Sequence, residues 1–160
     1  MKRLFALLFL LTSFVVNAQK KTTSYFVLNA GYEYWNGNYG RLGTDLYLVQ
    51  ENDNIFTINA NVNLGYMQDQ FRAIPEVGFG YLFNFKNNPG DPYSSNINSA
   101  FYSARVDFSP WTITPKVGFA VLSLLEFNAG YAFEFREYED FKNMNGFRAG
   151  LTIHLPTQLF

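Results

Sequence analysis

The chain has no cysteine, a single histidine and few charges, and each shortage excludes a class of protein. Without cysteine there can be no disulfide, no cysteine nucleophile and no lipid attached to an N-terminal cysteine. Charged residues make up only 16% of the chain, yet no uninterrupted apolar run after Val16 reaches the length of a membrane helix. The sequence therefore excludes a bundle of membrane helices, and the fold has to be stabilised without crosslinks.

The first eighteen residues have the pattern of a secretory signal peptide. Lys2 and Arg3 precede an uncharged stretch of thirteen residues, 4–16, and the small residue Ala18 follows shortly after it. Thirteen residues are too few to span ~30 Å of hydrocarbon as a helix. We therefore expect residues 1–18 to be removed as a signal peptide.

The remaining residues, 19–160, are expected to form one β-barrel domain. Without Lys2 and Arg3, the 12 basic residues fall to 10 against 13 acidic ones. Proteins that bind nucleic acid need a basic face, so this balance disfavours nucleic acid as a partner.

Residues 55–66 alternate between apolar and polar side chains along their length. A period of two indicates a β-strand with one apolar and one polar face, whereas a helical step would scatter the asparagines around the cylinder. Seven other segments alternate in the same way. The predicted strands are Tyr25–Tyr34, Leu42–Val49, Ile55–Tyr66, Glu76–Lys86, Ala100–Phe108, Lys116–Leu122, Leu125–Arg136 and Gly146–Leu155.

Turn-forming residues separate these strands. The segments expected as loops are 35–41, 50–54, 67–75, 87–98, 109–115 and 137–145. An even number of strands suits a closed antiparallel sheet whose two chain ends lie on the same side. The predicted fold class is all-β, an eight-stranded antiparallel up-and-down transmembrane β-barrel.

The charged residues of the predicted strands all fall on the polar faces, six of them acidic and five basic. They are Glu33, Asp45, Glu76, Lys86, Arg105, Asp107, Lys116, Glu126, Glu134, Arg136 and Arg148. Eight strands enclose too little space for the many Phe, Tyr and Leu side chains of the opposite faces. We therefore expect the apolar side chains to face lipid and the charges to pair with one another in a narrow lumen. The alternative, a secreted lipocalin-like lipid carrier, would reverse the two faces.

Two sequence motifs support an outer-membrane barrel. Residues 148–155 resemble the signal by which the barrel-assembly machinery recognises the last strand of such proteins, with Arg148, Gly150, Ile153 and Leu155 at its defining positions. The segment Pro75-Glu76-Val77-Gly78-Phe79 recurs as Pro115-Lys116-Val117-Gly118-Phe119, and each copy is expected at the start of a strand.

With these motifs the chain resembles the OmpA/OmpX-like outer-membrane β-barrel proteins of Bacteroidetes-type bacteria. The resemblance implies a monomeric barrel in the outer membrane of a Gram-negative bacterium, exported by a Sec-type route. Its expected partners are outer-membrane lipids, lipopolysaccharide and the barrel-assembly machinery. The resemblance supplies no catalytic residue, metal ligand or cofactor.

The function expected from these features is a structural or surface-interaction role in the cell envelope, with a lumen filled by polar side chains. A narrow porin-like channel for ions or small solutes is the alternative. An enzyme is not expected. A barrel that deacylates lipid A would need a histidine and a serine, but the single histidine, His154, has no His-x-Ser partner. His154 lies near the end of the last predicted strand and is expected to be a polar residue at the end of the lumen. The acidic residues Glu134, Glu137, Glu139 and Asp140 are expected to form a solvated loop, with loose binding of a divalent cation as the alternative.

Overall fold

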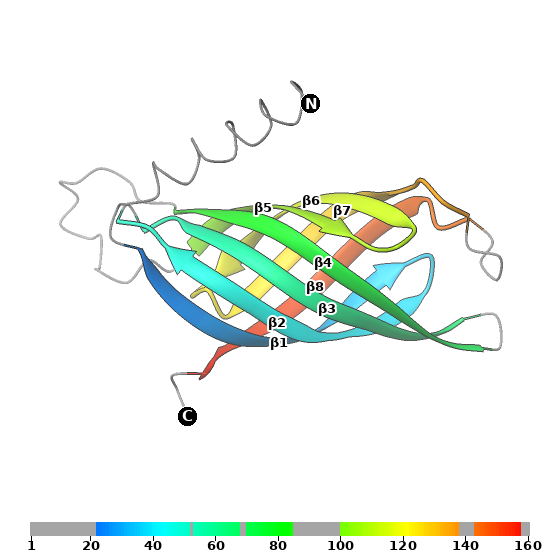
Figure 1. Ribbon diagram of the computed structural model, residues 1–160, viewed down its shortest axis with the longest axis horizontal. Helices are drawn as coiled ribbons and strands as arrows, with labels where there is room; N and C mark the ends of the chain where they lie inside the picture. Colours follow the sequence, from blue (N-terminus) through cyan, green and yellow to red (C-terminus); the bar gives the residue numbers. More distant parts are fainter. Residues whose placement is uncertain (1–21, 52, 68–69, 85–99, 138–142, 158–160) are drawn as a thin grey trace, which may run out of the picture.

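The computed structural model describes residues 22–51, 53–67, 70–84, 100–137 and 143–157. Its strands are β1 (Thr23–Trp35), β2 (Asn38–Val49), β3 (Ile55–Met67), β4 (Gln70–Asn84), β5 (Ala100–Phe108), β6 (Thr112–Val121), β7 (Leu125–Glu134) and β8 (Gly146–Pro156). Each strand pairs antiparallel with its neighbour in the chain, and β8 pairs with β1, so the sheet closes into a barrel (Figure 1). The predicted eight-stranded antiparallel barrel is confirmed. The predicted signal peptide, Lys86 and the predicted loop 87–98 lie outside the described residues.

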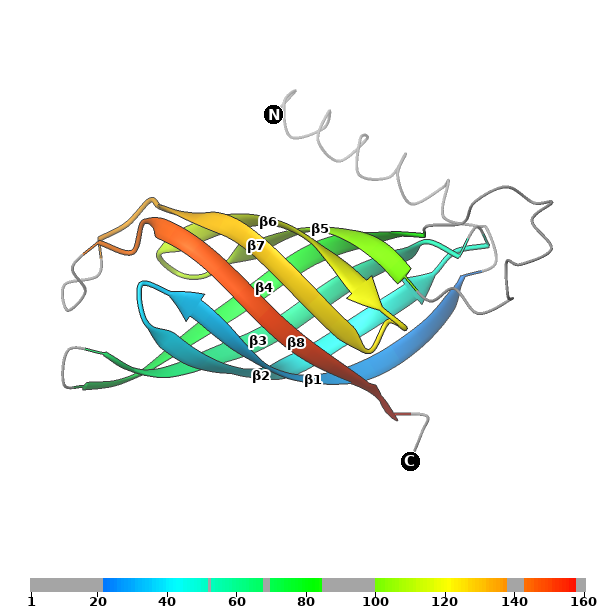
Figure 2. The same ribbon diagram turned by 180° about the vertical axis from the view of Figure 1, so that it is seen from behind.

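The strands cross the barrel obliquely (Figures 1 and 2). One circuit through paired residues returns to β1 ten residues further along, by way of Tyr25, Tyr47, Thr57, Gly80, Arg105, Lys116, Gly130, Arg148 and Trp35. For eight strands this stagger corresponds to a tilt of about 40° and a radius of about 8 Å. The interior is therefore wide enough for side chains.

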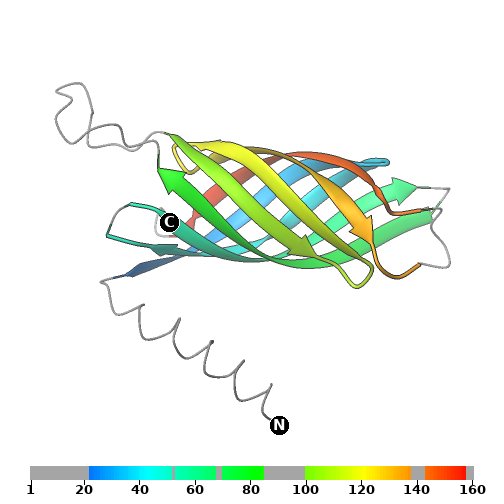
Figure 3. The ribbon, with the colours of Figure 1, turned by 90° about the horizontal axis from the view of Figure 1, so that it is seen from above.

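The two ends of the barrel differ. At the terminal end, β1 begins and β8 ends, together with the turns at 50–54 and 122–124. At the opposite, distal end lie the turns at 36–37 and 109–111. There the β3–β4 hairpin projects beyond the β5–β6 turn (Figure 3), because β4 pairs with β5 only from Val77 to Asn84.

Three strands extend further toward the distal end than the sequence predicts, so the predicted loops 35–41, 67–75 and 109–115 are too long. β2 begins at Asn38, β4 at Gln70 and β6 at Thr112. Two prolines that suggested loops, Pro75 and Pro115, lie within strands. Each stands where one neighbouring strand forms no backbone pair with it, so the missing N–H of proline is tolerated. Pro75 precedes the first β4–β5 pair, and beside Pro115 the β6–β7 pairing skips from Ile113–Phe133 to Lys116–Gly130.

The two faces of the sheet separate by chemistry. No charged residue occupies an outward position in the described strands, and the side chains exposed there are mainly Phe, Tyr, Leu, Val and Ile. Glu33, Asp45 and Arg148, by contrast, are at most 1% exposed. The arrangement contradicts the lipid-carrier alternative, which requires an apolar interior.

Candidate functional site

Glycines on the inward face make room for the long charged side chains of the interior. A Cβ on Gly118 would lie 2.1 Å from the carbonyl oxygen of Phe127 and 2.8 Å from Cα of Asn128. Both are backbone atoms of the next strand and cannot rotate away. A side chain is therefore excluded at this position, and the strands can approach closely around the ion pairs.

The distal half of the interior holds three carboxylates and three cations from six strands. Arg148 donates from Nε to Glu33 Oε1 at 2.7 Å and from Nη1 to Glu76 Oε1 at 2.6 Å. Arg41 Nη1 lies 2.8 Å from Glu33 Oε2 and 3.4 Å from Asp107 Oδ2. Lys116 pairs with Asp107 at 3.0 Å and also with Glu33. These six side chains form one charge-balanced cluster that joins β1, β2, β4, β5, β6 and β8.

A second cluster lies nearer the terminal end. Arg105 Nη2 is 2.5 Å from Glu126 Oε2, and its Nη1 is 3.4 Å from Asp45 Oδ1. His154 lies between the same carboxylates, with Nδ1 and Nε2 each 3.2 Å from a carboxylate oxygen. A neutral imidazole has only one N–H, so ionised carboxylates at both ring nitrogens favour the doubly protonated form. With His154 charged, the five carboxylates of the two clusters face five cations.

Apolar side chains close the interior at both ends. At the terminal end Val27, Tyr47, Ile55, Leu82, Phe101 and Ala120 pack together, and we call this group the terminal plug. At the distal end Trp35, Tyr39, Ile74, Ala132 and Met144 form the distal plug. The Tyr47 ring is 5.8 Å from the His154 ring, and the Arg148 guanidinium lies 4.1 Å above the Trp35 ring. The charge clusters are thus enclosed between two apolar layers.

The distal plug also fixes the end of the segment that precedes β8. Trp35 donates its indole N–H to the carbonyl of Met144 at 2.9 Å, and Asn36 donates to the carbonyl of Asn145 at 2.9 Å. Met144 is 3% exposed, so it lies inside the mouth of the barrel. Residues 143–145 therefore lie against the distal mouth of the barrel, beside Trp35 and Asn36.

The structure places most of the predicted lumen residues in the two clusters. These are Glu33, Asp45, Glu76, Arg105, Asp107, Lys116, Glu126 and Arg148. Glu134 is half-buried at the distal rim, where its carboxylate accepts a hydrogen bond from the Met144 N–H at 3.0 Å. Arg136 is exposed, so its predicted inward position is wrong: β7 ends at Glu134 and the alternation stops there.

The sequence interpretation missed Arg41 and the role of His154. The sequence predicts Arg41 in a loop, yet it is 4% exposed and pairs with all three carboxylates of the distal cluster. Its position two residues before Gly43 and four before Asp45 continues the inward phase of β2, and this spacing could have identified it. The inward apolar residues of both plugs were not anticipated as a group.

The residues of the predicted assembly signal have structural roles in β8. Arg148 belongs to the distal cluster, and Gly150 lies where a Cβ would be 3.0 Å from Asn128 Oδ1. Ile153 and Leu155 are 48% and 41% exposed on the outward face. Recognition by the barrel-assembly machinery stays a prediction.

Within the described part of the chain, no group of three or more His, Asp and Glu side chains is arranged to hold a metal ion. Glu139 and Asp140 of the predicted acidic loop lie outside that part. No helix among the described ranges is long and apolar enough to cross a membrane.

Comparisons with protein-family models, with curated proteins and with solved structures found no match. The resemblance to OmpA/OmpX-like barrels therefore stays a prediction from two short motifs and the strand pattern.

Proposed function

We propose that the chain is a small outer-membrane β-barrel protein with a side-chain-filled, non-conducting lumen, serving a structural or surface-interaction role in the cell envelope. The observation that carries the proposal is the outward face, which has no charged residue in any described strand. Val117 is 68% exposed, Tyr102 58% and Val77 55%. In water such a continuous apolar surface would drive aggregation, whereas acyl chains cover it without cost.

The dimensions of the barrel fit this environment. At a tilt of about 40° a strand rises roughly 2.5 Å per residue along the barrel axis, so ten residues rise about 25 Å. The apolar band of outer-membrane barrels has about this height. β6 and β7 are ten residues long, and the other strands are nine to fifteen.

The closed interior argues against the porin-like alternative. A conducting pore needs a continuous water path, but the terminal and distal plugs cover both ends of the charge clusters. Eight strands commonly enclose a lumen that side chains fill. We therefore propose that the protein acts through its outer surface and its distal segments, without an enzymatic activity.

Because β1 and β8 pair along nine residue pairs, the sheet closes within one chain and needs no second copy to complete it. We propose a monomer that contacts outer-membrane lipids and lipopolysaccharide and that is inserted by the barrel-assembly machinery after export and loss of residues 1–18.

Cell fractionation of the full-length chain tests this proposal. We expect the processed protein in the outer-membrane fraction, with faster gel migration before boiling than after it. Recovery in the soluble fraction would refute the membrane assignment. Planar-bilayer recordings test the closed lumen: we expect no steady openings, and reproducible unit conductance would favour the channel.

A further inference from the structure

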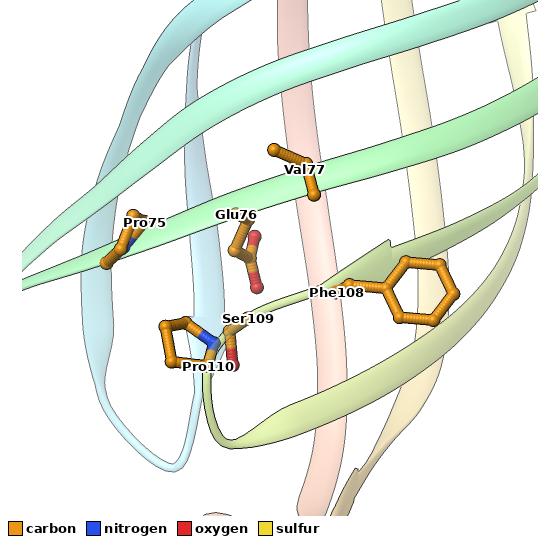
Figure 4. Close-up of a pocket in the computed structure, with 6 residues that line it drawn as sticks. All are labelled: Pro75, Glu76, Val77, Phe108, Ser109 and Pro110. Atoms are coloured by element: carbon orange, nitrogen blue, oxygen red, sulfur yellow. The ribbon is translucent and has the colours of Figure 1, made fainter.

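A notch opens on the outside of the barrel where β4 and β5 separate. Their pairing begins at Val77–Phe108, and β4 continues beyond this pair toward Gln70 while β5 ends. The notch has a volume of about 320 Å³ and is lined by Pro75, Glu76, Val77, Phe108, Ser109 and Pro110 (Figure 4).

Two prolines keep the notch from closing by backbone pairing. Continuing the β4–β5 register by two residues would place Pro75 opposite Pro110, and neither has an N–H to donate. Ser109, the residue before Pro110, forms its hydrogen bonds within the β5–β6 turn. Its N–H donates to the Thr112 carbonyl at 2.9 Å, and its Oγ accepts from the Thr112 N–H at 2.9 Å. The sequence at Pro75, Ser109 and Pro110 therefore prevents β4 and β5 from pairing further and keeps the notch open.

The notch presents an uncharged, apolar surface. The Glu76 carboxylate is directed into the lumen, where it binds Arg148 at 2.6 Å and the Asn63 amide at 2.6 Å. Val77 is 55% exposed on the outward face, and the Phe108 ring packs edge-on against Phe79 at 6.5 Å. The notch is thus continuous with the apolar outer face.

We propose that this notch is a binding site for one hydrocarbon chain of a membrane lipid. The inference rests on the membrane location proposed above. Within a bilayer there is no water to fill an apolar concavity, so an apolar chain has to occupy it. A filled notch also keeps dispersion contacts that a void would lose. Its volume is at the small end of the range for ligand pockets, which suits a single chain.

The internal repeat supplies a matched control. Val77 and Val117 occupy the same position in the two Pro-x-Val-Gly-Phe segments, and both point outward. Both valines are paired with two neighbouring strands, Val77 with Ala60 and Phe108, and Val117 with Ala104 and Ala129. Val77, however, is the residue at which the β4–β5 pairing ends, and it lines the notch, whereas Val117 does not line it. V77F would fill the notch, whereas V117F adds the same ring to the outward face away from the notch.

The test is native mass spectrometry of the processed wild type, V77F and V117F, each folded into phosphatidylcholine nanodiscs with or without lipopolysaccharide. We expect wild type and V117F to retain one lipid that V77F loses, and the mass of the adduct identifies which lipid supplies the chain. A photoreactive diazirine in the acyl chain should label the peptide containing Phe108 several-fold more than the one containing Val117.

Equal retention by wild type and V77F, equal labelling of the two peptides, or a dimer mass in place of a lipid adduct would overturn the binding site. Gel migration before and after boiling is recorded for the same samples. A chain that does not insert refutes the membrane proposal itself, while a chain that inserts but retains no lipid refutes only the notch.

Discussion

Replacing Arg148 with methionine tests whether ion pairs hold the interior together. Methionine keeps most of the length of the side chain and removes its charge. Glu33 would still contact Arg41 at 2.8 Å and Lys116, but Glu76 would keep only Asn63 at 2.6 Å and Arg41 at 4.0 Å. Breaking one partner of a fully buried ion pair costs about 3–5 kcal/mol, because the other charge stays buried without compensation. We expect R148M to lose this much unfolding free energy.

The assay is urea unfolding of the processed chain in lipid vesicles, followed by circular dichroism and by gel migration. R136M is the matched control, since Arg136 is exposed beyond β7 and should change stability by no more than about 0.5 kcal/mol. If R148M and R136M unfolded at the same urea concentration, the ion pairs would not be what stabilises the interior.

A second substitution separates lost charge from lost packing. In R148M/E76Q the unpaired carboxylate is replaced by a neutral amide that can still accept from Asn63. We expect the double variant to be more stable than the sum of the two single losses predicts, because no buried charge is left without a partner. Strict additivity would mean that the two side chains do not interact.

Three further predictions concern other parts of the barrel. A104R places a charge on the outward face beside Tyr81 and Val117 and should cost about 2–4 kcal/mol in vesicle unfolding; an unchanged midpoint would contradict contact with lipid. G118A forces a Cβ against backbone and should cost about 1–3 kcal/mol by urea titration, whereas G40A, whose nearest atom is 3.8 Å away, should behave as wild type. H154F leaves Asp45 and Glu126 to share Arg105 and should lower the unfolding free energy by about 3–5 kcal/mol at neutral pH; wild-type stability would mean that His154 is not a cation.

Alternation along the chain was enough to predict the eight strands and which side chains face outward. From Phe56 to Tyr66 every second residue is apolar, and these residues lie on the outward face of β3. The pattern works because a closed sheet between two different environments gives each face its own chemistry. The sequence also predicts a tight turn near Ser123, and the structure has it at 122–124, between Val121 at the end of β6 and Leu125 at the start of β7.

The inward apolar residues could not be found in the same way. Val27 lies between Phe26 and Leu28, and Leu82 lies between Tyr81 and Phe83, so both faces are apolar there and alternation is lost. Three or more consecutive apolar residues near the end of a strand indicate that apolar side chains also fill the lumen there. The pairing of particular charges was also out of reach, because partners such as Glu33 and Lys116 are brought together only by the stagger of the closed sheet.

The pairing of β1 with β8 has a consequence for how this protein reaches its native state. The residues that meet there, such as Trp35 and Arg148, come from opposite ends of the chain, so closure carries a large entropic penalty and occurs late. In hydrocarbon an unpaired row of backbone N–H and C=O groups has no hydrogen-bond partners, so a sheet that lacks its last strand is unstable within a bilayer. In the outer-membrane location that we propose, insertion and ring closure would be one concerted event, and a chain cut before β8 would remain outside the membrane.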